Sequence, residues 1–177
     1  MVIETERLEL KRLTDADLDE LVAMHSHPDV RRFLGAYERP QALVRLAADA
    51  HQWREHGHGL LAVRERSGGA FLGRVSLRHW PEFAETEIGW ALRREAWGHG
   101  YATEAARACV AWGFANLDVP YLTAMIEPIN ARSAAVAGRL GMEPLRPDEL
   151  MGVPVVVHAV DRAAWAGRPA TPRGGRR

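Results

Sequence analysis

The sequence has a single cysteine and no long apolar run. Cys109 lies alone in an apolar stretch, so no disulfide framework can form, and we expect a protein of the reducing cytoplasm. No segment approaches the roughly 20 apolar residues of a membrane-spanning helix. The opening Met1-Val2-Ile3-Glu4 lacks the pattern of a signal peptide. We therefore expect no membrane partner.

The sequence also has no excess of charge of either sign. Lys plus Arg and Asp plus Glu both number 23, so no overall field favours nucleic acid, and we expect no nucleic-acid partner. Lys11 is the only lysine. With the abundant alanine, this bias indicates GC-rich coding rather than phosphate recognition.

The eight histidines do not form a metal-binding pattern. Such a site on a helix typically needs two histidines one turn apart and a carboxylate as third ligand. No such set occurs, so we expect no metal cofactor.

Length and composition predict one globular domain. The chain has 177 residues, of which 47% are apolar and 26% charged, enough for a substantial core. We assign residues 1–166 to this domain. Residues 167–177, GRPATPRGGRR, lack apolar anchors and are predicted to be a disordered, solvated tail rather than an RNA-binding segment.

Alternating and helical periodicities outline the elements. Thr14 and the following aspartates favour the start of a helix. Strands are predicted at 8–11, 59–64, 71–80, 85–92, 121–126, 142–145 and 153–161, and further helices at 40–56, from 102 onward and at 130–140.

One stretch, residues 85–116, organises the chain. It reads as a strand, a charged loop, the glycine loop Trp97-Gly98-His99-Gly100-Tyr101, and a helix from Ala102 onward. The first N–H groups of a helix lack partners inside it, and the helix dipole adds positive potential there. Glycines let a phosphate approach the backbone closely. The stretch therefore predicts an anion-binding site.

Three ligand classes use such a site. A nucleoside-triphosphate loop would end in Gly-Lys-Ser/Thr, which His99-Gly100-Tyr101 does not supply. A dinucleotide loop, G-x-G-x-x-G, would need a third glycine at Thr103, and the chain lacks the repeated strand–helix units of that fold. The third class is the pyrophosphate of coenzyme A.

The motifs favour this third class by resemblance. The segments Trp97-Gly-His-Gly-Tyr-Ala-Thr-Glu-Ala105 and Asn130-Ala-Arg-Ser-Ala-Ala-Val-Ala-Gly-Arg-Leu-Gly-Met142 together resemble the GNAT superfamily of acyl-CoA-dependent N-acyltransferases, in its RimJ/RimL-type branch. The resemblance runs from Glu4 to about Trp165. It implies an α/β (α+β) fold: a mixed, largely antiparallel sheet of six to seven strands with helices on both faces.

The resemblance also implies an activity. Acetyl-CoA, more than succinyl-CoA, would be the co-substrate, and the acetyl group would pass directly to a primary amine in a ternary complex. The acceptor would be a protein N-terminus or a small-molecule amine, and the protein a monomer or homodimer. The alternatives are a non-catalytic CoA-binding module on the same fold and, more distantly, a dinucleotide-binding oxidoreductase.

Glu87 is the predicted catalytic base. It lies on the strand that, by the resemblance, diverges from its neighbour and receives the acyl-pantetheine arm. The N–H groups of Trp90 or Leu92 would then face the thioester or amide oxygens. The alternative is that Glu87 only points to solvent from a half-buried strand.

Ser133 and Asn130 are predicted to act near the thioester. Many GNAT enzymes have a tyrosine seven residues after this asparagine, but here Ala137 stands there and offers no proton. Ser133 matches a serine typical of the RimJ/RimL-type branch and would donate a hydrogen bond to the sulfur. Asn130 would bind the pantetheine amide, cap its own helix, or do both.

The glycine loop is predicted to bind the pyrophosphate mainly through its backbone. Trp97 replaces the Gln or Arg of the superfamily pattern Q/R-x-x-G-x-G/A, and His99 would lie near phosphate. The predicted cofactor-binding residues are Trp90, Leu92, Trp97, Gly98, His99, Gly100, Tyr101, Ala102, Thr103, Asn130 and Ser133. The candidates for the ribose phosphate, left unranked, are Arg93, Arg94, Arg132 and Arg139.

Overall fold

The computed structural model describes residues 1–35 and 37–167, so all but the first residue of the predicted tail lies outside it. The described residues form one sheet in the order β1-β2-β3-β4-β5-β6-β8-β7. The strands are β1 (Val2–Glu4), β2 (Leu8–Arg12), β3 (Leu60–Glu65), β4 (Phe71–Trp80), β5 (Glu85–Leu92), β6 (Tyr121–Ile126), β7 (Glu143–Leu150) and β8 (Val153–Asp161). Only β5 and β6 pair in parallel, which confirms a mixed, largely antiparallel sheet.

The sheet has eight strands rather than the six to seven expected, because β1 was not predicted. Its three residues are too few to show a period, and they become a strand by pairing with β2, Val2 opposite Lys11. The last hairpin is also longer than predicted. β7 extends through Pro147, which a strand at the end of the sheet tolerates.

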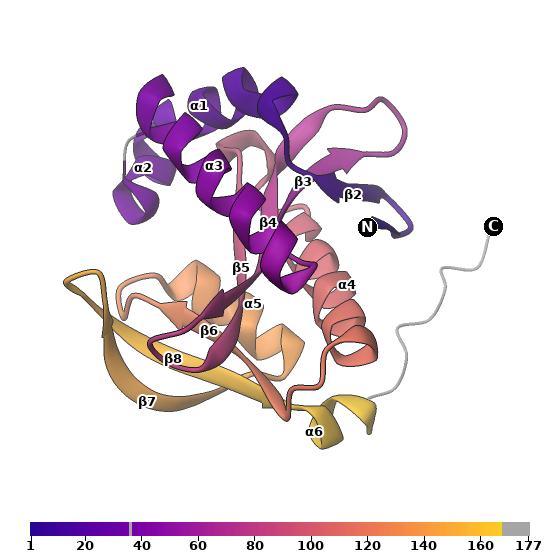
Figure 1. Cartoon of the computed structure of the whole chain (residues 1–177), viewed down its shortest axis with the longest axis vertical. Coiled ribbons are helices and arrows are strands. Elements are labelled where there is room, and N and C mark those ends of the chain that lie inside the picture. The colour runs from indigo at the N-terminus through magenta and orange to yellow at the C-terminus, as the bar shows by residue number, and fades with distance from the viewer. Residues whose placement is uncertain (36, 168–177) are drawn as a thin grey trace.

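Helices cover both faces of the sheet, as predicted (Figure 1). The short 3-10 turn η1 (Asp15–Asp17) leads into α1 (Leu18–Ser26), α2 (Pro28–Leu34) and α3 (Arg39–His56), which pack with Ala62 and Ala91 in one apolar cluster. On the other face α4 (Tyr101–Asn116) and α5 (Ala131–Leu140) pack against Leu77 and Ile88. The remaining helical segments are η2 (Arg94–Ala96) and α6 (Arg162–Ala166).

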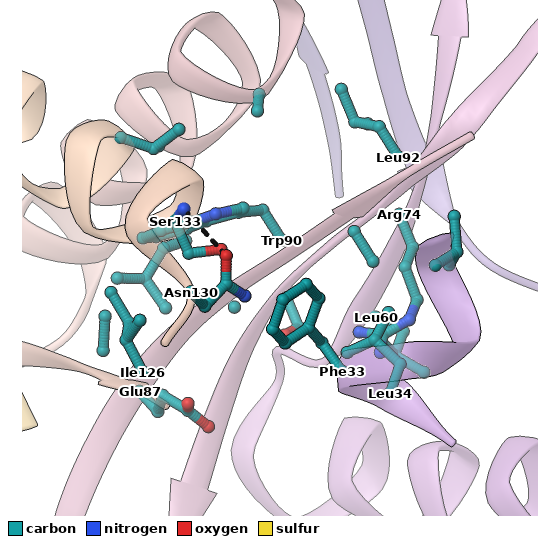
Figure 2. A pocket seen from close by; sticks show the side chains of 18 of the residues that line it. Phe33, Leu34, Leu60, Arg74, Glu87, Trp90, Leu92, Ile126, Asn130 and Ser133 are labelled. Carbon is teal, nitrogen blue, oxygen red and sulfur yellow. Dashed lines mark hydrogen bonds between the residues drawn. The ribbon is translucent and has the colours of Figure 1, made fainter. Parts of the chain in front are cut away.

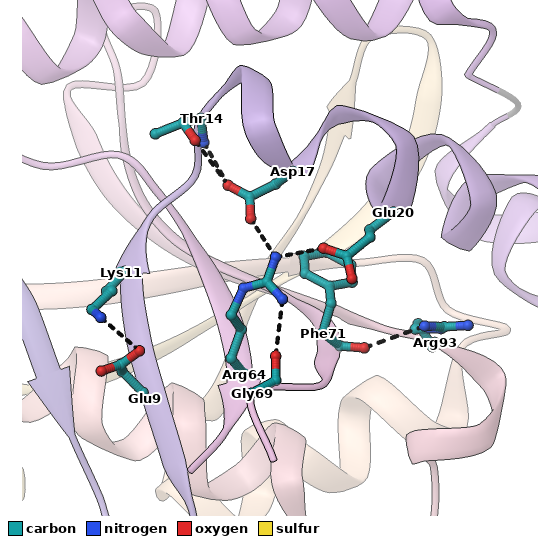
Figure 3. A network of polar contacts seen from close by, with 9 residues as sticks. All are labelled: Glu9, Lys11, Thr14, Asp17, Glu20, Arg64, Gly69, Phe71 and Arg93. Carbon is teal, nitrogen blue, oxygen red and sulfur yellow. Dashed lines mark hydrogen bonds and ion pairs between the residues drawn. The ribbon is translucent and has the colours of Figure 1, made fainter. Parts of the chain in front are cut away.

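Arg64 on β3 ties the first helical layer to the sheet (Figure 3). Its guanidinium donates to Asp17 Oδ1 at 2.7 Å, to Glu20 and to the Gly69 carbonyl at 2.9 Å. Asp17 in turn accepts from the backbone N–H of Thr14 at 2.9 Å. These contacts fix the position of α1, and with it the helical layer over one face of the sheet.

The sheet divides between β5 and β6. β4 and β5 are paired along their whole overlap, from Gly73–Leu92 to Trp80–Glu85, whereas β5 and β6 share the single register pair Glu87–Thr123. Beyond that pair the two strands diverge toward the carboxyl ends of both. Backbone groups along the diverging edges are left without a neighbouring strand.

Candidate active site

A large cleft opens where β5 and β6 diverge, with a volume of about 1710 Å³. Figure 2 shows residues of β4, β5 and β6 and the start of α5 around it, with Phe33 and Leu34 of α2 on the opposite side. The lining includes Glu87, Trp90, Leu92, Trp97, Gly98, Gly100, Tyr101, Ala102, Thr103, Asn130 and Ser133. The cleft thus brings together every predicted site residue except His99.

The start of α4 supplies free backbone donors to this cleft. The first N–H of the helix with a backbone acceptor is that of Glu104, which donates to the Gly100 carbonyl at 3.0 Å. The N–H groups of Tyr101, Ala102 and Thr103 have no acceptor among the described residues. Three free amides at the positive end of a helix form an anion-binding site.

The two loop glycines adopt a conformation that other residues rarely take. Gly98 and Gly100 have φ of 82° and 81°, in the left-handed region. These turns bring the chain from η2 into α4 so that the first amides of α4 line the cleft.

His99 lies away from the cleft. Its ring lines a separate small depression with Glu65 and Tyr101, and its carbonyl accepts from Arg7 at 3.0 Å. The loop therefore presents its backbone, not this imidazole, to the cleft.

Trp97 connects the glycine loop to β5 through its side chain. Its indole Nε1 donates to the Leu92 carbonyl at 2.9 Å. The guanidinium groups of Arg94 and Arg132 lie over its ring, at 5.0 and 4.7 Å from the centroid. Arg94, Arg132 and also Arg139 line the cleft, whereas Arg93 lies in the small depression with His99.

The diverging edge of β5 presents the N–H groups of Trp90 and Leu92. The Thr86 carbonyl accepts from Thr123 Oγ1 on β6 at 3.4 Å, whereas the N–H of Arg93 donates to β4 at 2.8 Å. Because successive residues of a strand point their N–H groups to opposite edges, even-numbered residues of β5 face β6. The N–H groups of Trp90 and Leu92 therefore face the opening, where β6 is no longer paired.

Glu87 lies at the vertex of the divergence. Its Oε2 accepts from the indole of Trp80 at 2.6 Å, and its Oε1 accepts from the Met125 N–H on β6 at 3.3 Å. Burial raises the pKa of this carboxyl above its ordinary value, although both hydrogen bonds and the nearby Arg78 act to lower it. A carboxylate held in this way is no longer a solvated surface group.

Asn130 and Ser133 form the start of α5. Asn130 caps the helix, since its Oδ1 accepts from the Ser133 N–H at 3.1 Å. Both side chains line the cleft, and Figure 2 shows them at one wall of it. Ala137 is fully buried and does not line the cleft, so this position holds no ring facing the site.

The sequence offered Trp80 as a possible lining residue of an acceptor pocket, but its contact with Glu87 and the role of Arg74 were missed. The bond from Trp80 to Glu87 and the presence of Arg74 in the cleft both depend on how β4 pairs with β5. The signal was the alternation of β4, which puts Arg74, Ser76 and Arg78 on one face, together with the register of the β4–β5 hairpin.

Within residues 1–35 and 37–167, no three His, Cys, Asp or Glu side chains gather as a metal site would require. In the same part of the chain, every helix is too short or too polar to cross a membrane.

The diverging parallel pair, the free helix amides and the half-buried carboxylate of Glu87 thus lie around one cleft. The model of the acetyltransferase (GNAT) domain matches residues 7–143. The uncharacterized protein YkkB of Bacillus subtilis is 30% identical over 161 residues, which cover 87% of this chain and 92% of that protein. The chain therefore belongs to the GNAT acetyltransferase family, and the resemblance seen in the sequence is confirmed.

Solved structures agree with this assignment. An acetyltransferase from Agrobacterium tumefaciens str. C58 has 33% sequence identity and a TM-score of 0.79, covering 90% of this chain and 94% of its own. RimL, a ribosomal L7/L12 alpha-N-protein acetyltransferase solved in complex with coenzyme A, has a TM-score of 0.76 at 16% identity and covers 93% of this chain and 99% of its own. At that identity the similarity shows a shared fold alone.

Proposed function

We propose that this acetyltransferase moves the acetyl group of acetyl-CoA directly to a primary amine in a ternary complex, with Glu87 as the base. One observation carries the proposal. A single cleft joins the free amides of α4, which suit a pyrophosphate, to the carboxylate of Glu87 at the other end of the diverging strands. The open edge of β5 lies between them.

The cleft residues have separate roles in binding and in proton transfer. The amides of Tyr101, Ala102 and Thr103 hold the pyrophosphate, and the N–H of Trp90 or Leu92 binds a carbonyl oxygen of the arm. Glu87 takes the proton of the attacking amine directly or through one water. An α-amine titrates near ~8, so about a tenth is neutral at pH 7, and a base of moderate strength suffices.

The proposed acceptor of the acetyl group is a protein N-terminus or a small-molecule amine. RimL is described as a ribosomal L7/L12 alpha-N-protein acetyltransferase, and we take the same acceptor class as the first to test. The lower pKa of an α-amine compared with lysine also favours it with a carboxylate base.

Mass spectrometry of reactions with acetyl-CoA and a panel of amines tests the proposal. The panel holds N-terminal peptides, amino acids, polyamines and aminoglycosides, and we expect a gain of one acetyl group on at least one α-amine. Calorimetry runs beside it. Tight acetyl-CoA binding without transfer to any amine would favour the non-catalytic CoA-binding module instead.

Ser133→Ala is expected to slow the reaction modestly. If the hydroxyl donates to the sulfur, its loss costs about 0.5–1.5 kcal/mol, or roughly two- to tenfold in kcat. The leaving thiol has a pKa near ~8.5 by analogy with cysteine and needs little protonation at neutral pH. Steady-state kinetics at saturating acetyl-CoA measure the effect.

The fold of this variant should be intact, because the bond to Asn130 comes from the backbone N–H of Ser133. An unchanged melting temperature checks this. Complete loss of activity in a folded variant that still binds acetyl-CoA would make Ser133 an essential acid or acceptor-binding group, contrary to our ordering.

A further inference from the structure

Arg74 lies on the face of the sheet opposite the α4 anion site. In the β4–β5 pair Arg74 stands opposite Ala91, and Arg78 stands opposite Glu87. Residues directly opposite in an antiparallel pair share a face. Ala91 packs with the α1–α3 cluster, whereas Val75 and Ile88 pack with α4. Arg74 and Glu87 therefore both face the α1–α3 layer.

The guanidinium of Arg74 has no acceptor of its own. Among the residues that the structure describes, it makes no hydrogen bond or ion pair, although it lines the cleft. In Figure 2 it runs from β4 toward Phe33, Leu34 and Leu60, which are apolar. Burial lowers its pKa from the ordinary value, although the charges of Tyr37 and Glu87 act to raise it. Arg74 is half-buried, and a guanidinium that lines a cleft without a hydrogen-bonded acceptor can bind a ligand anion there.

Glu87 does not serve as that partner. Its two oxygens accept from Trp80 and Met125, and it forms no ion pair with Arg74. Asp49, a second carboxyl group on this side, accepts from the Leu60 N–H at 2.7 Å, and burial raises its pKa to about 6. Both local carboxyl groups are thus engaged by other donors.

The residues between Glu87 and Arg74 on this face of the sheet have small side chains. The pair between them in the register is Gly89 opposite Ser76, and a Cβ at Gly89 would come within 2.9 Å of Ser76 Oγ. All four of these residues line the cleft. Arg74 and Arg78, which stands opposite Glu87, are four residues apart on β4, or roughly 13 Å along the backbone. A short extended chain can therefore lie over Gly89 with one end at Glu87 and the other at Arg74.

Two further cations lie on this side, which also carries the carboxyl groups of Glu87 and Asp49. Arg45 lies over the Tyr37 ring at 4.6 Å and Arg78 over the Trp80 ring at 4.3 Å, and both line the cleft. Their fields add to that of Arg74. A ligand carboxylate close to Arg74 would therefore be attracted by all three guanidinium groups.

We propose that Arg74 binds a carboxylate of the acceptor, and that the acceptor is a peptide N-terminus with an acidic residue at its second or third position. The inference rests on the proposed function and names its acceptor class. The roughly 13 Å span favours a peptide over a free α-amino acid, whose amine and carboxylate lie only a few ångströms apart.

The test measures binding, so it does not depend on transfer. Calorimetry on the protein saturated with coenzyme A, which cannot react, compares amidated Ala-Asp-Ala with amidated Ala-Asn-Ala. We expect the acidic peptide to bind at least about tenfold more tightly, as a charge-assisted guanidinium–carboxylate contact allows. Arg74→Gln should abolish the difference, and Arg74→Lys should restore part of it.

Arg45→Gln is the matched control. It removes the same charge from the same side but from an exposed position stacked on Tyr37. If Arg74 makes a direct contact, the preference for the acidic peptide survives in this variant. If both variants lost the preference for the acidic peptide equally, the preference would come from the general positive field and not from a contact with Arg74. That result would overturn the proposal.

Two further arms separate the remaining outcomes. Free alanine against alaninamide, which lacks the α-carboxylate, tests the amino-acid source, and a larger preference there than with the peptides would overturn the peptide assignment. Equal binding of the acidic and amide forms in both arms would overturn the role of Arg74. An Arg74-dependent preference without acetyl transfer from acetyl-CoA would leave this inference standing and sink the proposed function.

Discussion

Gly100→Val is expected to weaken acetyl-CoA binding at least about tenfold, or ~1.4 kcal/mol. A valine side chain at this position would stand beside the free amides of α4, where the pyrophosphate is proposed to lie. An added Cβ meets only Arg7 Nη2 at 3.5 Å, an ordinary contact, so the protein itself has room for it. Calorimetric titration with acetyl-CoA measures the change.

Backbone strain must be separated from this effect. Gly100 has φ of 81°, which a β-branched residue adopts only at a cost. Gly57 supplies a matched control, since its φ is 70° and a Cβ there has nothing within 4 Å. It follows α3 and does not line the cleft.

Gly57→Val should therefore lose comparable stability and keep its affinity for acetyl-CoA. If a folded Gly100→Val protein bound acetyl-CoA as tightly as the wild type, the glycine loop would not be the phosphate site. If both variants lost affinity equally, the effect would come from strain alone.

The loop was predictable because its properties are local. Left-handed turns at Gly98 and Gly100 and a helix start just after them follow from a few adjacent residues. The periodicity of apolar residues likewise predicted most strands and helices, and the paired motifs identified the family. Side-chain direction within the loop was not predictable, because it depends on the flanking turns, and His99 lies outside the cleft.

The acceptor side was less predictable because it depends on contacts between distant residues. β1 exists only through its pairing with β2, and Arg74 joins the site only through the β4–β5 register. Glu87 could be chosen from the sequence, but its two hydrogen bonds could not. Those bonds come from different strands, and the alternation of β5 alone equally allowed a solvated carboxylate.

Glu87→Gln is expected to lower kcat about 10²-fold or more while acetyl-CoA binding is preserved. The amide keeps the size of the side chain but cannot accept a proton near neutral pH. Burial raises the pKa of Glu87, so the wild type should lose activity as the pH falls through that pKa and the carboxylate becomes protonated. The pH–rate profile of the variant should lack this acid limb. The difference in kcat between the variant and the wild type should shrink as pH rises and more amine becomes neutral.

The pH dependence of stability should run opposite to the pH dependence of activity. A carboxyl group whose pKa is raised by folding stabilises the protein most at low pH, and this contribution is lost as pH rises through the folded pKa. Removing the charge of Glu87 at neutral pH therefore does not remove a stabilising ion. In glutamine an NH2 group replaces one of the two carboxylate oxygens and would face the N–H of Trp80 or of Met125, so thermal melting should accompany the kinetics.

Trp80→Phe separates the base from its positioning. It removes the indole donor, 2.6 Å from Glu87 Oε2, and leaves the carboxylate in place. Because that hydrogen bond lowers the pKa, its loss should move the acid limb of the pH–rate profile to higher pH, with kcat near the wild-type value above the limb. A deficit in Glu87→Gln that is uniform across pH would indicate positioning rather than proton transfer. An unchanged kcat would leave Glu87 as a structural carboxylate that joins Trp80 on β4 to Met125 on β6.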